Sequence, residues 1–113
     1  IPPSLGNFTQ LESLIISNNH FQGSIPYELF LKNLTLLDLS FNRINRTLPI
    51  SHSNLTKLEK LDISHNLLVG SLNLLSVGSH AQLTTIHLSN NFIRGEIPPE
   101  FGYLPFLNTL DKA

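Results

Sequence analysis

Residues 34–42 read Leu34-Thr-Leu-Leu37-Asp-Leu39-Ser40-Phe-Asn42, which fits the pattern L-x-x-L-x-L-S-x-N. The same pattern, with Leu or Ile at its apolar positions, returns in residues 11–19, 58–66 and 83–91, and a further copy begins at residue 107. The copies start 23, 24, 25 and 24 residues apart. A recurring period of this size is the signature of a repeat architecture, in which each period adds one unit to a stack. The repeat therefore decides the fold.

Apolar side chains alternate within each copy, as Leu37 and Leu39 do in residues 34–42. Alternation by two places both side chains on one face of a short β-strand. Because the next strand comes one period later and runs in the same direction, the strands form a parallel sheet. A single repeat cannot cover its own leucines, so stacked neighbours bury them as one continuous core.

An asparagine ends every complete copy of the pattern, where the strand turns out of the sheet. An amide group carries both hydrogen-bond donors and an acceptor. A column of asparagines can therefore satisfy turning backbone groups in its own repeat and in the adjacent one. We interpret these residues as scaffold rather than as a site; they are Asn19, Asn42, Asn66 and Asn91.

The second half of the repeat is patterned as well. A Gly-x-Ile-Pro element follows the asparagine by four residues in Gly23-Ser-Ile25-Pro26 and in Gly95-Glu-Ile97-Pro98. Glycine permits turn conformations that other residues resist, and proline favours an extended path. The combined pattern, L-x-x-L-x-L-S-x-N-x-(L/F/I)-x-G-x-I-P-x-x-L-G-x-L, resembles the plant-specific leucine-rich repeat. The chain is similar to the ectodomains of plant receptor-like kinases and receptor-like proteins, and to polygalacturonase-inhibiting proteins, over essentially its whole length.

This resemblance implies an α/β-type leucine-rich-repeat solenoid. The family fold is a right-handed superhelix with a short parallel β-sheet on its concave face and extended or 3-10 segments on its convex face. Family members act in extracellular recognition of peptides, small ligands or partner proteins. The resemblance thus implies an apoplastic location, or the outer side of the plasma membrane in a longer parent protein.

We expect a single array over residues 1–113. It comprises a partial repeat over 1–10, complete repeats over 11–33, 34–57, 58–82 and 83–106, and a partial repeat over 107–113. The paired-cysteine caps that are typical of the plant family are absent. We therefore interpret the chain as a fragment, either a truncated gene product or an excised piece. Uncapped ends expose core leucines and favour end-to-end self-association.

Two repeats depart from the pattern in their second halves. The second repeat reads Arg46-Thr-Leu48-Pro49 where glycine and isoleucine are expected, and His52 stands at its outer apolar position. In the third repeat Asn73 replaces the proline, and one extra residue follows. We expect locally different outer loops in these two repeats.

Composition excludes several classes of function. The chain has a formal net charge of −1, no cysteine and no run of basic residues. Thiolate catalysis and cysteine-based metal sites are therefore excluded, and no electrostatic footprint for nucleic acid is visible. No apolar stretch approaches the roughly 18 residues that a membrane span needs. We expect no cofactor and no membrane contact within this fragment.

Side chains between the inward-pointing leucines face the other side of the sheet and form columns along the repeats. Strands lie about 4.8 Å apart, so five of them give a floor about 19 Å wide, which suits five or six residues of extended peptide. Leu36 and Phe41 are the apolar anchors that we expect there, although scattered surface apolar residues are also normal. His87 has Asp62 and Asp111 as neighbours in its column. The candidate partner-binding residues are Leu36, Asp38, Phe41, Lys60, Asp62, His65, Thr85, His87 and Asn90.

One further column, Ser17, Ser40, Ser64 and Ser89, is expected to be exposed as well. It does not indicate a catalytic serine, although Ser64 is flanked by Asp62 and His65. Ser64 belongs to a position that is serine in every repeat, and no nucleophile elbow or pair of oxyanion donors is visible. His65 and His87 on adjacent strands bring two imidazoles near each other, which does not amount to a metal site without further ligands. We predict neither an enzyme nor a metal centre.

Four N-x-S/T sequons are candidates for glycosylation. They begin at Asn7, Asn33, Asn45 and Asn54.

Three functions remain open at this stage. The first is a receptor-like kinase or receptor-like protein ectodomain that binds a peptide or co-receptor, with plant defence as one setting. The second is a secreted inhibitor of a microbial cell-wall-degrading enzyme. The third is a structural or ice-binding repeat, which would depend on a flat, regular Ser/Thr array.

Overall fold

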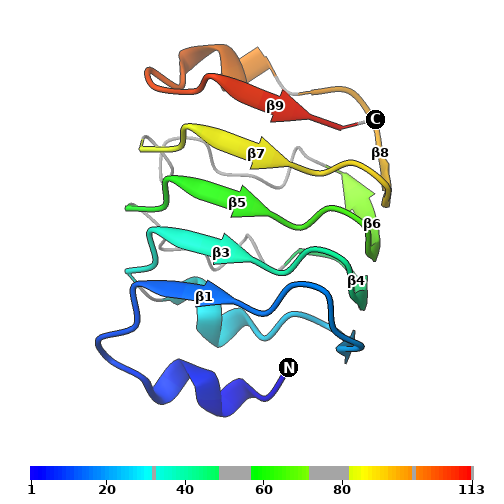
Figure 1. Ribbon diagram of the computed structural model, residues 1–113. Coiled ribbons are helices and arrows are strands. Elements are labelled where there is room, and N and C mark those ends of the chain that lie inside the picture. Colours follow the sequence, from blue (N-terminus) through cyan, green and yellow to red (C-terminus); the bar gives the residue numbers. More distant parts are fainter. Residues whose placement is uncertain (32, 49–56, 72–81, 98, 113) are drawn as a thin grey trace.

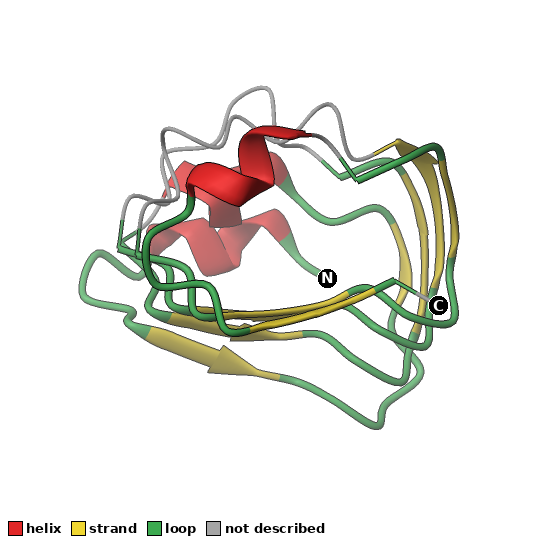
Figure 2. Cartoon of the chain, turned by 90° about the horizontal axis from the view of Figure 1, so that it is seen from above, coloured by secondary structure: helices red, strands yellow, loops and turns green. Residues whose placement is uncertain are grey.

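The chain coils into a solenoid with two sheet walls and a row of short helices, as a computed structural model shows (Figures 1 and 2). The structure describes residues 1–31, 33–48, 57–71, 82–97 and 99–112. One parallel sheet contains β1 (Ser13–Ile15), β3 (Leu36–Asp38), β5 (Lys60–Asp62), β7 (Thr85–His87) and β9 (Thr109–Asp111). The predicted repeat solenoid is confirmed.

The pairing register of this five-stranded sheet follows the repeat. Ser13 lies beside Leu36, Leu36 beside Lys60, and Lys60 beside Thr85. The next outward column runs from Ile15 through the strands in the same way and ends at Asp111; its members are Ile15, Asp38, Asp62, His87 and Asp111. Both columns are those expected from the sequence.

A second parallel sheet forms the adjoining wall of the solenoid (Figure 2). Its strands are β2 (Gln22–Gly23), β4 (Arg43–Arg46), β6 (Leu67–Ser71) and β8 (Phe92–Arg94). This sheet was not predicted from the repeat pattern. The strands are short and begin one to three residues after an asparagine, so the backbone of the repeat imposes their pairing more than any local pattern does.

Helical turns of the 3-10 type lie opposite the five-stranded sheet (Figure 2). They are η1 (Pro3–Asn7), η2 (Tyr27–Leu31) and η6 (Pro99–Tyr103). The short 3-10 segments expected on the convex face are therefore present.

The core lies between these walls and is apolar throughout. The middle residues of the three central strands β3, β5 and β7, which are Leu37, Leu61 and Ile86, are buried, and Leu29 of η2 is buried in the same cluster. The other buried apolar residues are Ile25, Leu34, Leu39, Ile44, Leu48, Leu58, Ile63, Leu68, Leu83, Leu88, Phe101 and Leu104. This continuous core joins neighbouring repeats, as expected for a solenoid whose single units cannot cover their own leucines.

The asparagines bridge adjacent repeats through both ends of the amide. Asn66 Nδ2 donates to the carbonyl oxygens of Ile63 (3.2 Å) in its own repeat and Leu39 (2.9 Å) in the preceding one. Its Oδ1 accepts a hydrogen bond from the Ile44 backbone amide at 3.0 Å. Asn42 and Asn91 make equivalent contacts. Each amide thereby satisfies backbone groups that the turning chain leaves without a ladder partner.

A left-handed backbone recurs four residues after each asparagine. Gly23, Gly70 and Gly95 have φ of 85°, 100° and 90°, and Arg46 has φ of 71° at the equivalent position. The arginine therefore keeps the backbone conformation that glycine has at this position in the other repeats, although a side chain in this region costs about 1–2 kcal/mol. The other irregular positions, His52 and Asn73, lie outside the described residues.

Gly70 should tolerate no side chain without loss of stability. Its φ is +100°, and an added Cβ would lie 3.1 Å from Thr47 Cγ2. We expect Gly70→Ala to lower the free energy of unfolding by about 1–3 kcal/mol. Gly102→Ala is the matched control, because nothing lies within 4 Å of an added Cβ there. Urea denaturation followed by circular dichroism compares the two, and equal effects would contradict the assignment.

Candidate recognition surface

The outer face of the five-stranded sheet carries a depression of about 260 Å³. Residues from the three central strands β3, β5 and β7 line it, and Leu61 of β5 is among them. Six of the nine candidate residues meet here: Leu36, Asp38, Lys60, Asp62, Thr85 and His87. Lys60 is exposed, and the others are half-buried. The columns expected from the sequence thus converge on one concavity that offers a cation, carboxylates, an imidazole and an apolar side chain.

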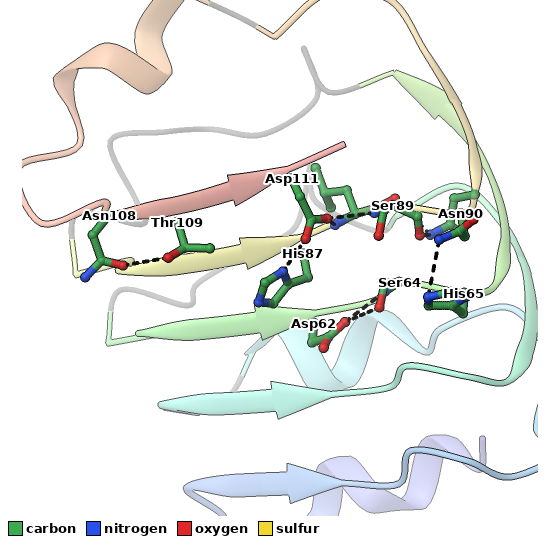
Figure 3. Close-up of polar contacts among 11 residues, drawn as sticks. Asp62, Ser64, His65, His87, Ser89, Asn90, Asn108, Thr109 and Asp111 are labelled. Atoms are coloured by element: carbon green, nitrogen blue, oxygen red, sulfur yellow. Dashed lines mark hydrogen bonds and ion pairs between the residues drawn. The ribbon is translucent and has the colours of Figure 1, made fainter. Parts of the chain in front are cut away.

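Asp38 and Asp62 are each anchored by the serine two residues further along. The Oδ1 atom of Asp62 accepts hydrogen bonds from the Ser64 backbone amide at 3.0 Å and from Ser64 Oγ at 2.6 Å (Figure 3). Asp38 and Ser40 make the same two contacts. These two carboxylates therefore have a structural role as well, because each aspartate closes the turn after its own strand.

The expectation that the serine column is exposed was wrong at its centre. Ser40 and Ser64 are only 4% and 5% exposed. Their hydroxyls turn toward the aspartate oxygens, and this geometry withdraws them from the face. The alternation of a strand does not continue past its last residue, so these positions do not follow the outward columns.

His87 occupies the position that aspartate holds in the two preceding repeats, and Asp111 of the next strand replaces the missing carboxylate. Asp111 Oδ1 accepts hydrogen bonds from the backbone amides of Leu88 and Ser89, both at 3.1 Å. Its Oδ2 lies 2.5 Å from His87 Nδ1 (Figure 3). Two strands thus share one hydrogen-bonded cluster at the side of the depression.

This cluster favours the ionised form of Asp111. Desolvation by burial raises the pKa of Asp111. Hydrogen bonds from His87 and from the Ser89 and Leu88 amides lower it by more than burial raises it, so the pKa lies below its ordinary value. The side chain is still 41% exposed, and solvent screening keeps the effect modest.

Stability should depend on pH through Asp111. A carboxyl group with a lowered pKa in the folded state stabilises the fold above its unfolded pKa, and this contribution is lost as the pH falls through the folded value. We expect wild type to be more stable than Asp111→Asn at pH 7, with the difference shrinking as the pH falls below about 4. Urea unfolding of both proteins at pH 7 and below about pH 4 tests this. A difference in stability that does not change with pH would contradict it.

The remaining three candidates, Phe41, His65 and Asn90, lie three residues beyond the ends of β3, β5 and β7. The Phe41 and His65 rings stack with centroids 4.0 Å apart and an interplanar angle of 10°. Asn90 Nδ2 lies 3.2 Å from His65 Nε2 (Figure 3). All three residues have φ between 55° and 57°, so one repeated backbone conformation presents them side by side. Phe41 is 49% exposed and offers apolar surface next to the charged depression.

An exposed apolar residue at this face, Ile15, was missing from the candidates. Ile15 is 59% exposed and begins the column that continues with Asp38. Its position, where the second and third repeats have aspartate, was the available signal. Asp111 was placed in the column but not among the candidates, because the pattern alone does not show that it replaces an aspartate of another repeat.

The other predicted sites differ in their surroundings. Asn7 and Asn33 are exposed, whereas Asn45 is half-buried and its Oδ1 has no hydrogen-bond partner. Asn54 lies outside the described residues. Within the described part of the chain, no group of three or more His, Asp or Glu side chains is placed to hold a metal ion. No helix in that part is long and apolar enough to cross a bilayer.

Comparison with known proteins agrees with this architecture. Leucine rich repeat family models match residues 9–68 and 82–104. Receptor-like protein 39 of Arabidopsis thaliana is 32% identical over 112 residues, which are 97% of this chain and 13% of that protein. The chain thus spans a small part of this relative.

Solved structures show the same repeat geometry. The ectodomain of the Arabidopsis receptor kinase HAESA, in complex with an IDA peptide hormone, superimposes with a TM-score of 0.91 and 36% identity, covering 97% of this chain and 18% of that one. A plant ice-binding protein superimposes with a TM-score of 0.80 and 34% identity, covering 95% and 34%. The chain therefore belongs to the leucine-rich repeat family, and its repeats are those of plant receptor-like proteins and receptor kinase ectodomains.

Proposed function

We propose that the chain is a non-catalytic, extracellular recognition module of a receptor-like protein or receptor-like kinase. Its ligand is a peptide or a partner protein that binds the outer face of the five-stranded sheet. The observation that carries the proposal is the convergence of six candidate residues on one depression over β3, β5 and β7. The peptide complex of HAESA, to which the chain is similar, supports a ligand of this class.

The depression suits an extended peptide. The serine contacts occupy Oδ1 of Asp38 and Asp62, so a ligand would meet Oδ2 of each carboxylate. Lys60, on the same strand as Asp62, supplies an ammonium group that can donate hydrogen bonds. The carboxylates, the ammonium group and the imidazole of His87 lie on adjacent strands, so each can recognise a different residue of the ligand. Phe41 contributes apolar contact at the side.

The buried serines count against the ice-binding alternative. That function needs a flat, exposed array of hydroxyl groups, and Ser40 and Ser64 direct theirs to aspartates. The enzyme-inhibitor alternative would use the same outer face with a larger protein partner. We propose glycosylation at Asn7 and Asn33, whose side chains are exposed.

A peptide selection tests the proposal. Random heptapeptides displayed on phage and selected against the 113-residue chain should give binders whose affinity falls at least about tenfold in Phe41→Ala and in Lys60→Glu, the loss typical of an interface anchor. The matched controls are Phe106→Ala and Lys57→Glu, which alter exposed side chains of the same types outside the depression. Selected peptides that retain full affinity for both face variants would contradict the proposal.

A further inference from the structure

All three arginines of the chain belong to the four-stranded sheet. Arg43 and Arg46 lie on β4 and Arg94 on β8, and all three side chains are exposed. The strands β2, β4, β6 and β8, as the structure describes them, contain no Lys, Asp or Glu. This wall is therefore cationic, although the whole chain has a formal net charge of −1.

Three large apolar side chains lie on β6 and β8, the same two-strand part of the sheet that carries Arg94. Leu67 and Val69 of β6 are 44% and 45% exposed, and Phe92 of β8 is 62% exposed. The register places Val69 beside Phe92, so the three side chains form one patch across two strands. We call Leu67, Val69 and Phe92, with Arg43, Arg46 and Arg94 around them, the lateral surface.

The core does not need these side chains. Strand alternation directs Ile44 and Leu68 inward, where they are 1% and 0% exposed. Leu67, Val69 and Phe92 face the other way, on a wall distinct from the five-stranded sheet (Figure 2). Contiguous exposed apolar surface with a polar rim is typical of interaction sites. Aromatic residues and arginine are enriched in the interfaces of protein complexes, whereas lysine is depleted.

We propose that the lateral surface is a second docking surface, separate from the ligand face, and that it binds a protein segment with carboxylates around an apolar centre. Charge complementarity selects this occupant, because a guanidinium binds a carboxylate through two parallel hydrogen bonds and stays charged at all physiological pH values. Phe92, the most exposed of the three apolar side chains, is the main anchor. Carboxylates of the partner meet Arg43 and Arg46 on one side of the patch and Arg94 on the other.

An anionic membrane would also attract arginines, but the apolar side chains do not suit it. Leu67 and Val69 keep more than half of their surfaces covered by the sheet. Three apolar side chains on a sheet fit the complementary surface of a protein better than they penetrate a bilayer, where membrane-binding elements bury a broad apolar face in the headgroup region.

Two synthetic peptides test this inference on the 113-residue chain produced in bacteria, which leaves Asn45, the neighbour of Leu67, without a glycan. One peptide reads Glu-Phe-Asp-Leu-Glu-Phe-Asp, and its counterpart carries Lys at every acidic position. In a ¹⁵N NMR titration, we expect the acidic peptide to shift amides of β4, β6 and β8. Its affinity should fall at least about tenfold in Phe92→Ser and not in the control Phe106→Ser.

The charge-reversed variant Arg43→Glu/Arg94→Glu should prefer the basic peptide. Equal affinity of wild type for both peptides, or shifts confined to β1, β3, β5, β7 and β9, would overturn the inference. The third arm of the test is sedimentation with phosphatidylcholine vesicles that contain phosphatidylserine, and we expect the chain not to bind them. Vesicle binding that is lost in Phe92→Ser would assign the surface to a membrane instead. Failure here leaves the Phe41 and Lys60 results unaffected, so the two proposals are tested separately.

Discussion

Asn66→Asp should lower the free energy of unfolding by about 3–5 kcal/mol, the cost of an unpaired buried charge. The change keeps the size of the side chain and the acceptor for the Ile44 amide. It replaces the amide nitrogen with an oxygen that faces the carbonyl oxygens of Leu39, Ile63 and Ser64. Asn66 is 5% exposed, so water cannot compensate. Urea denaturation at pH 7 measures the loss.

Asn19→Asp is the matched control for this substitution. Asn19 belongs to the same column but is exposed, and its Nδ2 donates to Ile16 and Ser17 at the surface. Solvated hydrogen bonds contribute about 1 kcal/mol or less each, so the control should lose far less stability. Equal losses in the two variants would show that the bridging role assigned to the asparagines is wrong.

Leu37→Ala should lower the free energy of unfolding by about 2–5 kcal/mol. Leu37 is 0% exposed and lies in the middle of β3, with Leu14 and Leu61 beside it in register. The truncation leaves a cavity in a core that neighbouring repeats share, so it weakens the contacts of the repeats on both sides.

Leu67→Ala controls for the loss of leucine side-chain atoms as such. Leu67 is 44% exposed, and surface substitutions of this kind change stability by about 0.5 kcal/mol or less. Thermal unfolding followed by circular dichroism compares the two variants. A loss for Leu67→Ala as large as that for Leu37→Ala would contradict the assignment of inner and outer faces.

The register of the five-stranded sheet could be predicted from the sequence, and the second sheet could not. Leu37 and Leu39 alternate, and the repeat period carries that alternation to the same place in each strand, which determines the register. The four-stranded sheet has no such signal, because Gln22–Gly23 and Arg43–Arg46 share little beyond ending four residues after an asparagine. Their pairing follows from stacking of whole repeats.

The candidate site was predictable in its columns but not in its hydrogen bonds. Strand alternation places Asp38, Asp62 and His87 on one face. Which way a carboxylate turns depends on the geometry after the strand, where Ser64 folds back onto Asp62. The role of Asp111 depends on a neighbouring repeat having lost its own aspartate, and a side chain that acts across repeats is not visible in a single copy of the pattern.

The most direct measurement concerns where a ligand contacts the chain. A peptide selected against the Phe92→Ser chain, in which the lateral surface lacks its anchor, can be titrated into the ¹⁵N-labelled protein. Ligand binding over β3, β5 and β7 predicts that the largest amide shifts fall at Asp38, Lys60, Asp62, Thr85 and His87. Largest shifts on η2 or on β6, with these five amides unmoved, would contradict it.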